Sequence, residues 1–484
     1  IVMVGTPDDN SADAVVGVKL KGIEFEGLDQ RHAVSGSYLH DGRMAVLVKN
    51  TRRTSIKGCL FTKIDSSAIF FQKPAVYDYE NSTYYNTTKN YDAEILDCRF
   101  EAEAHAVAGR ALLHAIVPEG VDGLTVADCS SVWCDDFVSS EGSYQSADEA
   151  ETDTFTPTVS GWTLGAVKRT GRSWNISNCH CHNSSEHAYY LSSVDCTLTG
   201  GSITTDALTI CDGNVKLRGD FMTVTGLNIV CRKTAYSVAE PSRRVSITGG
   251  SVISSADTEG GVFDIDGQGL SAYIDARPWM TSYFTMGAIT ISNVDVNLPE
   301  AAGTGLKHTA VRVYTDTSDT NYPEGQIIGV TVKGCAFRNY RNGLYVIGQL
   351  ERLVNVDGNT WIAKPFVSAS FTTSTTMNTE ALLVAYSSHT LTMNNVRFGN
   401  NRVYGAKYLM KTHNDGGSNV RLPHGMCGNE FSYIQNDFGT GVFVVEDQTH
   451  FTDNYGIYFL DRGIFNTKTI GNCLACGAEG GNRA

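Results

Sequence analysis

A short pattern, apolar-x-apolar-x-(Gly/Asn/Asp)-x-x-apolar, recurs about a dozen times along the chain and constrains its fold more than any single residue. Clear copies span residues 18–25, 222–229 and 330–337. Each copy has the two-residue alternation of a strand, then a Gly, Asn or Asp that tolerates a left-handed backbone, then a second strand. A sandwich of hairpins would not place the same turn residue after the same strand each time, so the pattern indicates a repeating coil.

The spacing of the turn residues sets the size of one coil. These residues are Gly22, Gly58, Asp97, Asp128, Asn178, Gly200, Gly226, Gly249, Asn293, Gly334, Gly358 and Asn395. The shortest gaps, 22 to 26 residues, fit one turn of a parallel β-helix, and longer gaps fit a turn with an insertion or two turns with one degenerate copy. We predict an all-β fold, a right-handed single-stranded parallel β-helix with loop insertions and a C-terminal β cap.

The predicted domains follow from where the pattern is clear. Residues 1–399 form the parallel β-helix, with an acidic loop insertion at about 139–171 that is either a lid beside a groove or a solvated flap. Residues 400–484 form C-terminal rungs, a cap and a trimer-contact region, because an uncovered coil end exposes strand edges. An Ala-rich stretch at 101–117 predicts one short helix.

Five of the 13 cysteines directly follow a turn residue. They are Cys59, Cys98, Cys129, Cys179 and Cys335. In a coil these positions form an inward column, so we interpret the cysteines as reduced core residues and not as a disulfide framework. The Cys-His-Cys-His run at 179–182 looks like a metal motif, but strand alternation would point its cysteines inward and its histidines outward. We therefore predict no metal and no cofactor.

Charge and hydropathy limit the partners. The net charge of −14 argues against nucleic acid and anionic membranes, which need clustered Lys and Arg. No run approaches the ~20 apolar residues of a membrane span. The chain opens inside a strand pattern without a signal peptide, so we expect an upstream segment to have been removed. Aromatic side chains on rungs ~4.8 Å apart suit an extended polysaccharide.

Residues 46–71 (VLVKNTRRTSIKGCLFTKIDSSAIFF) and 175–193 (NISNCHCHNSSEHAYYLSS) resemble bacteriophage tailspike proteins of the pectin-lyase-like β-helix superfamily. The resemblance is architectural and covers roughly residues 15–400. It implies a homotrimer that binds, and usually cleaves, bacterial surface polysaccharide such as capsule, exopolysaccharide or O-antigen. It also implies a virion component that acts at the bacterial cell surface and is attached to the phage particle through an N-terminal segment missing here.

Hydrolysis of a glycosidic bond needs two carboxyl groups, and the first candidate site is Asp135, Asp136, Glu186 and His187. Asp135 follows the turn cysteine of its coil by six residues, and Glu186 follows that of the next coil by seven. Neighbouring coils therefore bring these side chains to one edge. We predict that they are catalytic.

One turn later, Lys216 and Arg218 share a strand face. An Asp-Asp pair, a His one rung on and a basic strand after it resemble the site of polygalacturonase-type glycosidases in the same superfamily. The Asn-Thr-Asp, Gly-His-Gly and Arg-Ile-Lys signatures of those enzymes are absent, however.

The second candidate catalytic pair is Asp264 and Asp266, which alternation places outward while Phe263 and Ile265 point inward. Two residues apart on a strand, the aspartates lie about 6.5–7 Å apart at the backbone, which leaves room for a water. Their mutual repulsion would raise the pKa of one of them. The predicted substrate-binding residues are Asp206, Lys216, Arg218, Asp257, Arg277 and Trp279.

Three other functions stay open. A polysaccharide lyase would use His187, Tyr189 or Tyr190 as the base and Lys216 or Arg218 to hold a uronate carboxylate. The negative chain would repel such an acidic substrate, so hydrolysis is favoured. The other two alternatives are a non-catalytic polysaccharide-binding adhesin and a secreted pectinase, which would be a monomer and not a trimer.

Overall fold

The computed structural model of the chain describes a set of ranges, and the account below concerns these alone. They are residues 2–5, 14–27, 44–64, 66–72, 76–78, 83–85, 90–102, 112–140, 171–206, 211–239, 242–254, 261–267, 286–298, 309–315, 327–347, 354–363, 381–385, 396–412, 419–421, 425–438 and 442–444. They contain strands, turns and bends but no helix, and hence no helix long and apolar enough to cross a membrane. The chain divides into two compact units, residues 1–235 and 236–484.

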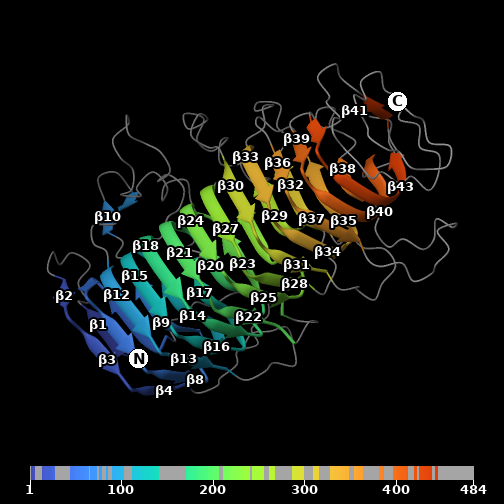
Figure 1. Ribbon diagram of the computed structural model, residues 1–484. Coiled ribbons are helices and arrows are strands. Elements are labelled where there is room, and N and C mark those ends of the chain that lie inside the picture. The colour runs from blue at the N-terminus through green and yellow to red at the C-terminus, as the bar shows by residue number, and fades with distance from the viewer. Residues whose placement is uncertain are drawn as a thin grey trace, which may run out of the picture. The chain divides into compact units, whose positions relative to one another are not determined.

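The coils of the first unit are built from three parallel sheets, in which strands of consecutive coils pair in parallel (Figure 1). The first sheet contains β2 (Val15–Val16), β3 (Lys19–Lys21), β6 (Thr51–Arg52), β7 (Ser55–Lys57), β12 (Asn90–Leu96), β15 (Val121–Ala127), β18 (Gly171–Ser177), β21 (Ser193–Thr199) and β24 (Asp220–Thr225). The second contains β4 (Glu24–Glu26), β8 (Leu60–Thr62), β13 (Arg99–Glu101), β16 (Ser130–Val132), β19 (His180–His182), β22 (Ser202–Thr204) and β25 (Asn228–Cys231). The third contains β1 (Val2–Gly5), β5 (Val46–Lys49), β9 (Ser67–Gln72), β14 (Leu112–Pro118), β17 (Cys134–Ser139), β20 (His187–Leu191) and β23 (Asn214–Leu217).

The second unit repeats this arrangement. Its first sheet contains β27 (Arg243–Thr248), β30 (Met286–Ser292), β33 (Ile327–Lys333), β36 (Val354–Asp357), β39 (Val396–Gly399) and β42 (Gly425–Cys427). Its second contains β28 (Ser251–Ser254), β31 (Asp295–Asn297), β34 (Ala336–Tyr340) and β37 (Thr360–Ala363). Its third contains β26 (Tyr236–Ala239), β29 (Gly261–Gly267), β32 (Thr309–Thr315), β35 (Asn342–Ile347) and β38 (Ala381–Ala385). The long strands β40 (Arg402–Thr412) and β43 (Glu430–Phe438) pair with each other, and β40 pairs with both β37 and β38.

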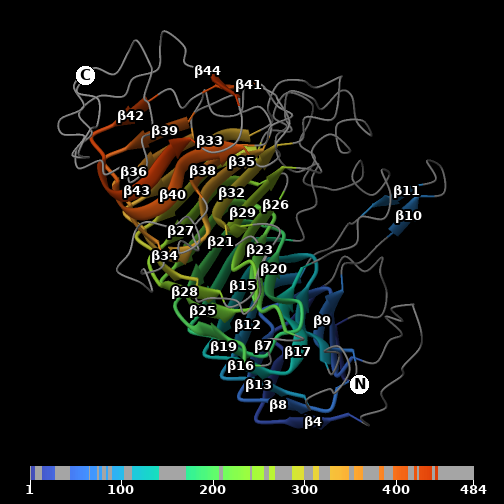
Figure 2. The same ribbon diagram turned by 90° about the vertical axis from the view of Figure 1, so that its right-hand side faces the viewer.

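Two small sheets complete the described strands. β10 (Val76–Asp78) and β11 (Thr83–Tyr85) form an antiparallel hairpin that stands apart from the coils of its unit (Figure 2). β41 (Asn419–Arg421) and β44 (Val442–Val444) pair in parallel. The predicted parallel β-helix is thus confirmed in both units, whereas the predicted domain boundary at residue 399 stays a prediction.

A left-handed residue ends the first strand of each coil, as predicted. All predicted turn residues from Gly22 to Gly358 have φ between 51° and 68°. The copy centred on Asn395 is wrong, because residues 396–399 form β39 in the first sheet and the turn falls at Asn400, with φ of 53°. Asn395 itself lies outside the described residues.

A second column of left-handed residues, which the sequence does not predict, lies five positions before the turn. It contains Arg53, Asp92, Gly123, Ser173, Asp195, Phe221, Arg244, Ala288 and Gly329. The strand pairing skips this position: Tyr91 pairs with Asp122 and Ala93 with Leu124, while Asp92 and Gly123 stay outside the register. The two strands thus leave the ladder at the same position and keep their register, and this break recurs in the coils that contain the residues named above. In the sequence, Asn395 stands five residues before Asn400, at the same offset.

Aromatic rings and the cysteine column fill the interior of the first unit. Phe25, Phe61 and Phe100 stack with ring centroids 4.9 Å apart. Cys98 and Cys129 are fully buried, and the Cys129 thiol donates to the carbonyls of Ala127 and, one coil back, Ile95. The described cysteines are free thiols, nearly all buried, as predicted.

In the last described coils of the second unit, asparagine occupies the position after the turn. Asn359, Asn401 and Asn429 are buried, and each of the first two accepts on Oδ1 from the backbone N–H one coil back, at 2.9 and 3.0 Å. Asn401 Nδ2 donates to the carbonyls of Gly399 and Val356, which are the counterparts of those used by Cys129. A small side chain that both donates and accepts thus satisfies the corner at the cysteine positions of the first unit and at the asparagine positions of the second.

The predicted short helix at 101–117 is wrong for the part of it that the structure describes. Glu101 ends β13, and β14 pairs with β9 and β17, which buries Ala115 and Ile116 completely. Pairing on both sides and core burial outweigh the helix propensity of the alanines.

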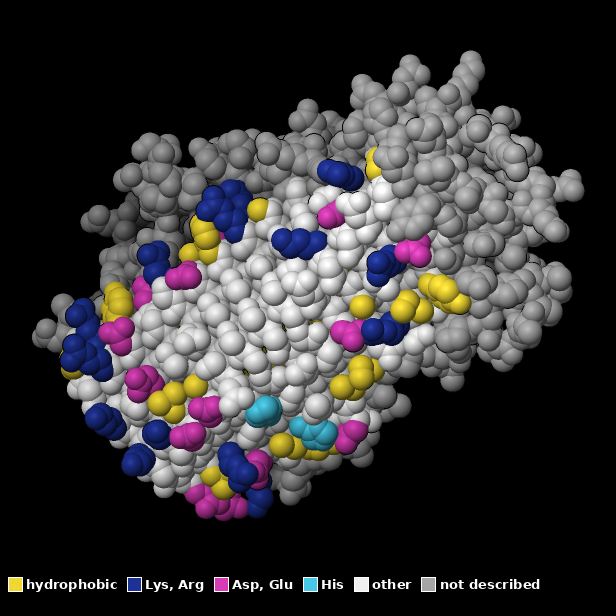
Figure 3. All heavy atoms as spheres, viewed as in Figure 1, with side chains coloured by type: hydrophobic (Ala, Val, Ile, Leu, Met, Phe, Trp, Pro, Cys, Tyr) yellow, Lys and Arg dark blue, Asp and Glu magenta, His cyan; other side chains and the backbone are white. Residues whose placement is uncertain are grey.

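Acidic and basic side chains are interspersed over the described surface seen in Figure 3, with wide uncharged areas between them. The chain's negative charge is therefore not gathered into one described patch on that face.

Candidate active site

Three side chains from consecutive coils line up on the third sheet of the first unit. His114 on β14 pairs in register with Asp136 on β17, and the backbone N–H of His187 on β20 donates to Asp136 Oδ1 at 2.9 Å. Asp136 Oδ2 lies 3.6 Å from His114 Nε2, and Asp136 Oδ1 lies 3.3 Å from His187 Nδ1. The carboxylate is therefore held between two imidazoles.

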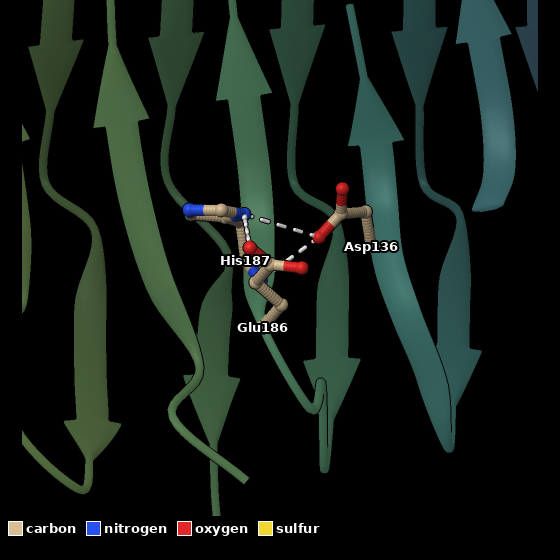
Figure 4. A group of neighbouring side chains, drawn as sticks. All are labelled: Asp136, Glu186 and His187. Atoms are coloured by element: carbon tan, nitrogen blue, oxygen red, sulfur yellow. Dashed lines mark hydrogen bonds and ion pairs between the residues drawn. The ribbon is translucent and has the colours of Figure 1, made fainter. Parts of the chain in front are cut away.

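Glu186 lies directly before β20 and brings a second carboxyl group to the same place (Figure 4). Its Oε1 is 3.8 Å from His187 Nδ1. Asp136, Glu186 and His187 each offer one polar atom, and these three atoms lie within 4.8 Å of one another. The structure thus brings together three of the four residues of the first predicted catalytic group.

The two carboxyl groups differ sharply in environment. The Asp136 side chain is 2% exposed and that of Glu186 is 58% exposed. Burial by itself would raise the pKa of Asp136, but the contact with His187, its charge and the charge of His114 outweigh burial and lower this pKa. Asp136 is therefore an ionised, positioned carboxylate, and Glu186 faces solvent.

Because of a bulge in β20, Tyr190 and not Tyr189 lies beside His187. The pairing of β20 with β23 shifts register between His187 and Tyr189, so β20 carries an extra residue there. Tyr189 packs in the core against Phe137, with ring centroids 5.7 Å apart. The Tyr190 ring instead lies 5.2 Å from that of His187, although an odd spacing would ordinarily put them on opposite faces.

Lys216 and Arg218 meet Tyr190 from the next coil, as their predicted shared face requires. Lys216 Nζ lies 4.6 Å from the Tyr190 ring centroid, and Arg218 Nη1 donates to the Tyr190 hydroxyl at 3.3 Å. Tyr190 thus lies between the two cations and His187, and the two positive charges are one coil from Glu186 and two coils from Asp136.

Asp135, the fourth residue of the first predicted group, and the predicted binding residue Asp206 both have corner contacts. Asp135 Oδ1 accepts from the Ser185 hydroxyl, so this carboxylate belongs to the corner before β20. Asp206 is exposed, accepts from Asn183 Nδ2 at 2.7 Å and lies 3.5 Å from His182 Nε2. The predicted binding residues Asp257, Arg277 and Trp279 lie outside the described residues.

The second predicted catalytic pair is held by an arginine that the sequence did not single out. Arg312 Nε and Nη2 donate to the two oxygens of Asp264 at 2.6 and 2.7 Å, and Nη2 also donates to Asp266 at 3.2 Å. Phe263 and Ile265 point inward as predicted, but Asp264 is only 8% exposed. Burial raises the pKa of Asp264 to about 6, Asp266 adds to the shift and Arg312 opposes it, so the predicted repulsion is a minor cause.

His114 is the site residue that sequence reasoning missed. Residues 112–116 contain no carboxyl side chain, and a histidine occupies the position in register with Asp136. Alignment of the third strands of consecutive coils would have found it, because His114, Asp136 and His187 then fall in one row.

No protein-family model matches this sequence, and a search of curated proteins finds no match. Among solved structures, the chain is similar to a double mutant of the tailspike protein of E. coli bacteriophage HK620, with 12% identity over 88% of this chain and 72% of that one and a TM-score of 0.48. A single mutant of the same tailspike in complex with a pentasaccharide matches with 11% identity over 85% of this chain and 67% of that one, at a TM-score of 0.46. The likeness concerns the fold alone.

Proposed function

We propose that the protein hydrolyses glycosidic bonds of a bacterial surface polysaccharide, with Asp136 and Glu186 as its two carboxyl groups. One observation carries the proposal: these carboxyl groups come within 4.8 Å of each other from neighbouring coils, one buried and ionised and the other exposed. Retaining glycosidases separate their carboxyl groups by about 5–5.5 Å and inverting ones by about 6.5–9.5 Å. The short separation favours retention.

The two environments assign the roles. Asp136, whose pKa is lowered, serves as the nucleophile that attacks the anomeric carbon, and Glu186 protonates the departing glycosidic oxygen. Water then attacks the glycosyl–enzyme ester while Glu186 takes its proton, which returns both groups to their starting state. His114 and His187 position Asp136, and substrate approaches from the solvent side of Glu186.

The sequence resemblance to tailspikes supports the choice of substrate and setting. We propose a capsule, exopolysaccharide or O-antigen as the polymer and a homotrimer on a virion as the assembly. Tyr190, Lys216 and Arg218 offer an aromatic ring and two cations next to the carboxylates, which suits stacking on a sugar and contact with its hydroxyls or acidic groups.

The test is to incubate the protein with capsule and lipopolysaccharide preparations and to follow both reducing ends and the absorbance of unsaturated sugars. We expect reducing ends alone, and we expect Asp136→Asn and Glu186→Gln each to slow their release by about 10²–10⁴-fold. The matched control is Glu94→Gln, which neutralises an exposed glutamate on β12 and should leave the rate unchanged. Full activity in both site variants would refute the assignment.

A lyase is the second candidate, because the cations beside Tyr190 stand next to an imidazole. His187 would take the C5 proton of a uronic acid while Lys216 and Arg218 hold its carboxylate. Release of reducing ends together with unsaturated-sugar absorbance would establish this reaction in place of hydrolysis. Binding with neither product would establish an adhesin.

A further inference from the structure

We propose that Asp136, Glu186 and His187 form a binding site for a divalent transition-metal ion such as Zn²⁺, and that the bound ion inhibits hydrolysis. The second half of this statement rests on the proposed function, since it assumes that the same two carboxylates do the chemistry. The first half stands on geometry alone.

The distances between the donor atoms fit a shared ion. Two ligands of a tetrahedral zinc, each about 2.0–2.1 Å from the metal, lie about 3.3–3.4 Å from each other. His187 Nδ1 is 3.3 Å from Asp136 Oδ1 and 3.8 Å from Glu186 Oε1. The histidine and the aspartate therefore already have the separation of two zinc ligands, and a small movement of the exposed glutamate side chain brings in the third.

An unsatisfied nitrogen points into the same space. His187 is 8% exposed, and its Nδ1 makes no hydrogen bond to any part of the chain that the structure describes. The ring turns this nitrogen toward both carboxylates (Figure 4). Its polar contacts are with the two carboxylates, at 3.3 and 3.8 Å, and an ion held between the three donors would give this buried nitrogen a direct bond.

The surroundings supply the support that metal ligands need. His114 Nε2 lies 3.6 Å from Asp136 Oδ2, the oxygen that does not face His187, and so orients the carboxylate from behind. The exposure of Glu186 leaves a path for the ion and open positions for water. One imidazole with two carboxylates favours zinc, manganese or cobalt over the all-oxygen coordination that calcium and magnesium prefer.

Occupancy of the site would stop the proposed hydrolysis. An ion bound to Asp136 removes the nucleophile, and the same ion bound to Glu186 removes the acid. Zn²⁺ should therefore compete with the polysaccharide, and a chelator should restore the rate in full.

The binding test uses the metal-free full chain titrated with ZnCl₂ in a calorimeter and with CoCl₂ followed by visible absorption. We expect one ion per chain and, for His187→Gln, at least about tenfold weaker binding. His114→Gln should weaken binding by up to about tenfold, because it acts through Asp136. The matched control is His180→Gln, which removes an exposed histidine on β19 and should bind as the parent does. Unchanged circular dichroism shows that each variant is folded.

Several results would overturn the site. Absence of binding to the parent chain, equal binding by His187→Gln, or a thiolate charge-transfer band that places cobalt on cysteine would each refute it. None of these readouts depends on cleavage, so they leave the hydrolase proposal standing. Conversely, cleavage that requires the ion and stops with chelator would refute inhibition and the metal-free mechanism, while the site itself would remain.

Discussion

The contacts of Arg312 indicate that Asp264 and Asp266 have a structural and not a catalytic role. The substitution Arg312→Met tests this interpretation. The guanidinium occupies both oxygens of Asp264 and also reaches Asp266, so neither oxygen of Asp264 is left to protonate a leaving group. Methionine keeps much of the apolar stem of arginine but removes the charge and the donors. We expect this change to lower stability and to leave cleavage intact.

The expected size follows from the burial of Asp264, which is 8% exposed. Removal of one partner of a buried ion pair typically costs about 3–5 kcal/mol, because the other charge is left uncompensated. Protonation limits the cost here, since burial already raises the pKa of Asp264 to about 6. We therefore expect a loss of about 3 kcal/mol at neutral pH, at the lower end of that range.

Hydrogen exchange at the amides of β29 and β32 is the appropriate assay, because the two units need not unfold together. The matched control is Arg338→Met. Arg338 also pairs with an aspartate one coil back, Asp295, but both side chains are about half exposed. That exposed pair should be worth less than about 1 kcal/mol.

A catalytic role for the second pair would give the opposite outcome. Arg312→Met would then abolish cleavage per folded molecule while exchange at β29 and β32 stayed as in the parent chain. That combination would refute the structural interpretation and move the active site to Asp264 and Asp266.

Two further predictions concern stability. Burial raises the pKa of Asp264 from its ordinary ~3.9 to about 6, so the folded state binds this proton more tightly than the unfolded state does. The resulting stabilisation of the folded state, about 3 kcal/mol, is complete below about pH 4 and is lost as the pH rises through about 6. Exchange at β29 should show this slope in the parent chain, and Asp264→Asn should remove it. Asn401→Leu takes the acceptor from the Asn359 N–H and the donor from two carbonyls, so it should cost about 3 kcal/mol in thermal unfolding. Asn401→Cys should cost less, since cysteine makes the equivalent contacts in the first unit, and equal losses would contradict the shared role.

The coil was predictable because its rules are local. Strand alternation and a left-handed turn residue act over a few neighbours, so the corners at Asp128, Asn178 and Gly334 could be placed from sequence alone. The second left-handed column was not predictable, because its side chains point outward and any type is accepted, including Phe221. The error at Asn395 arose because an asparagine also stands at Asn400, five residues later, where the turn falls.

The candidate site was predictable in part. The number of residues after the turn cysteine of each coil predicted that Asp136, Glu186 and His187 lie at one edge, and the structure brings these three together. Counting could not show that Asp135 serves the corner, because a single residue of register moves a side chain to the other face. It also could not show the capture of Asp264 by Arg312, which lies 48 residues away across an insertion of arbitrary length.

The buried cysteines of the first unit allow local unfolding of its coils to be measured chemically. The contact with the Cys179 thiol and burial raise the pKa of Cys129 to about 12, and burial raises that of Cys134 to about 12. Only the thiolate reacts with alkylating agents, and at pH 7 such a thiol is ionised in about one molecule in 10⁵. Alkylation therefore requires local unfolding of the coil that holds the cysteine. The rate at which iodoacetamide modifies each cysteine measures how often that coil unfolds, including the coils that carry Asp136 and its neighbours.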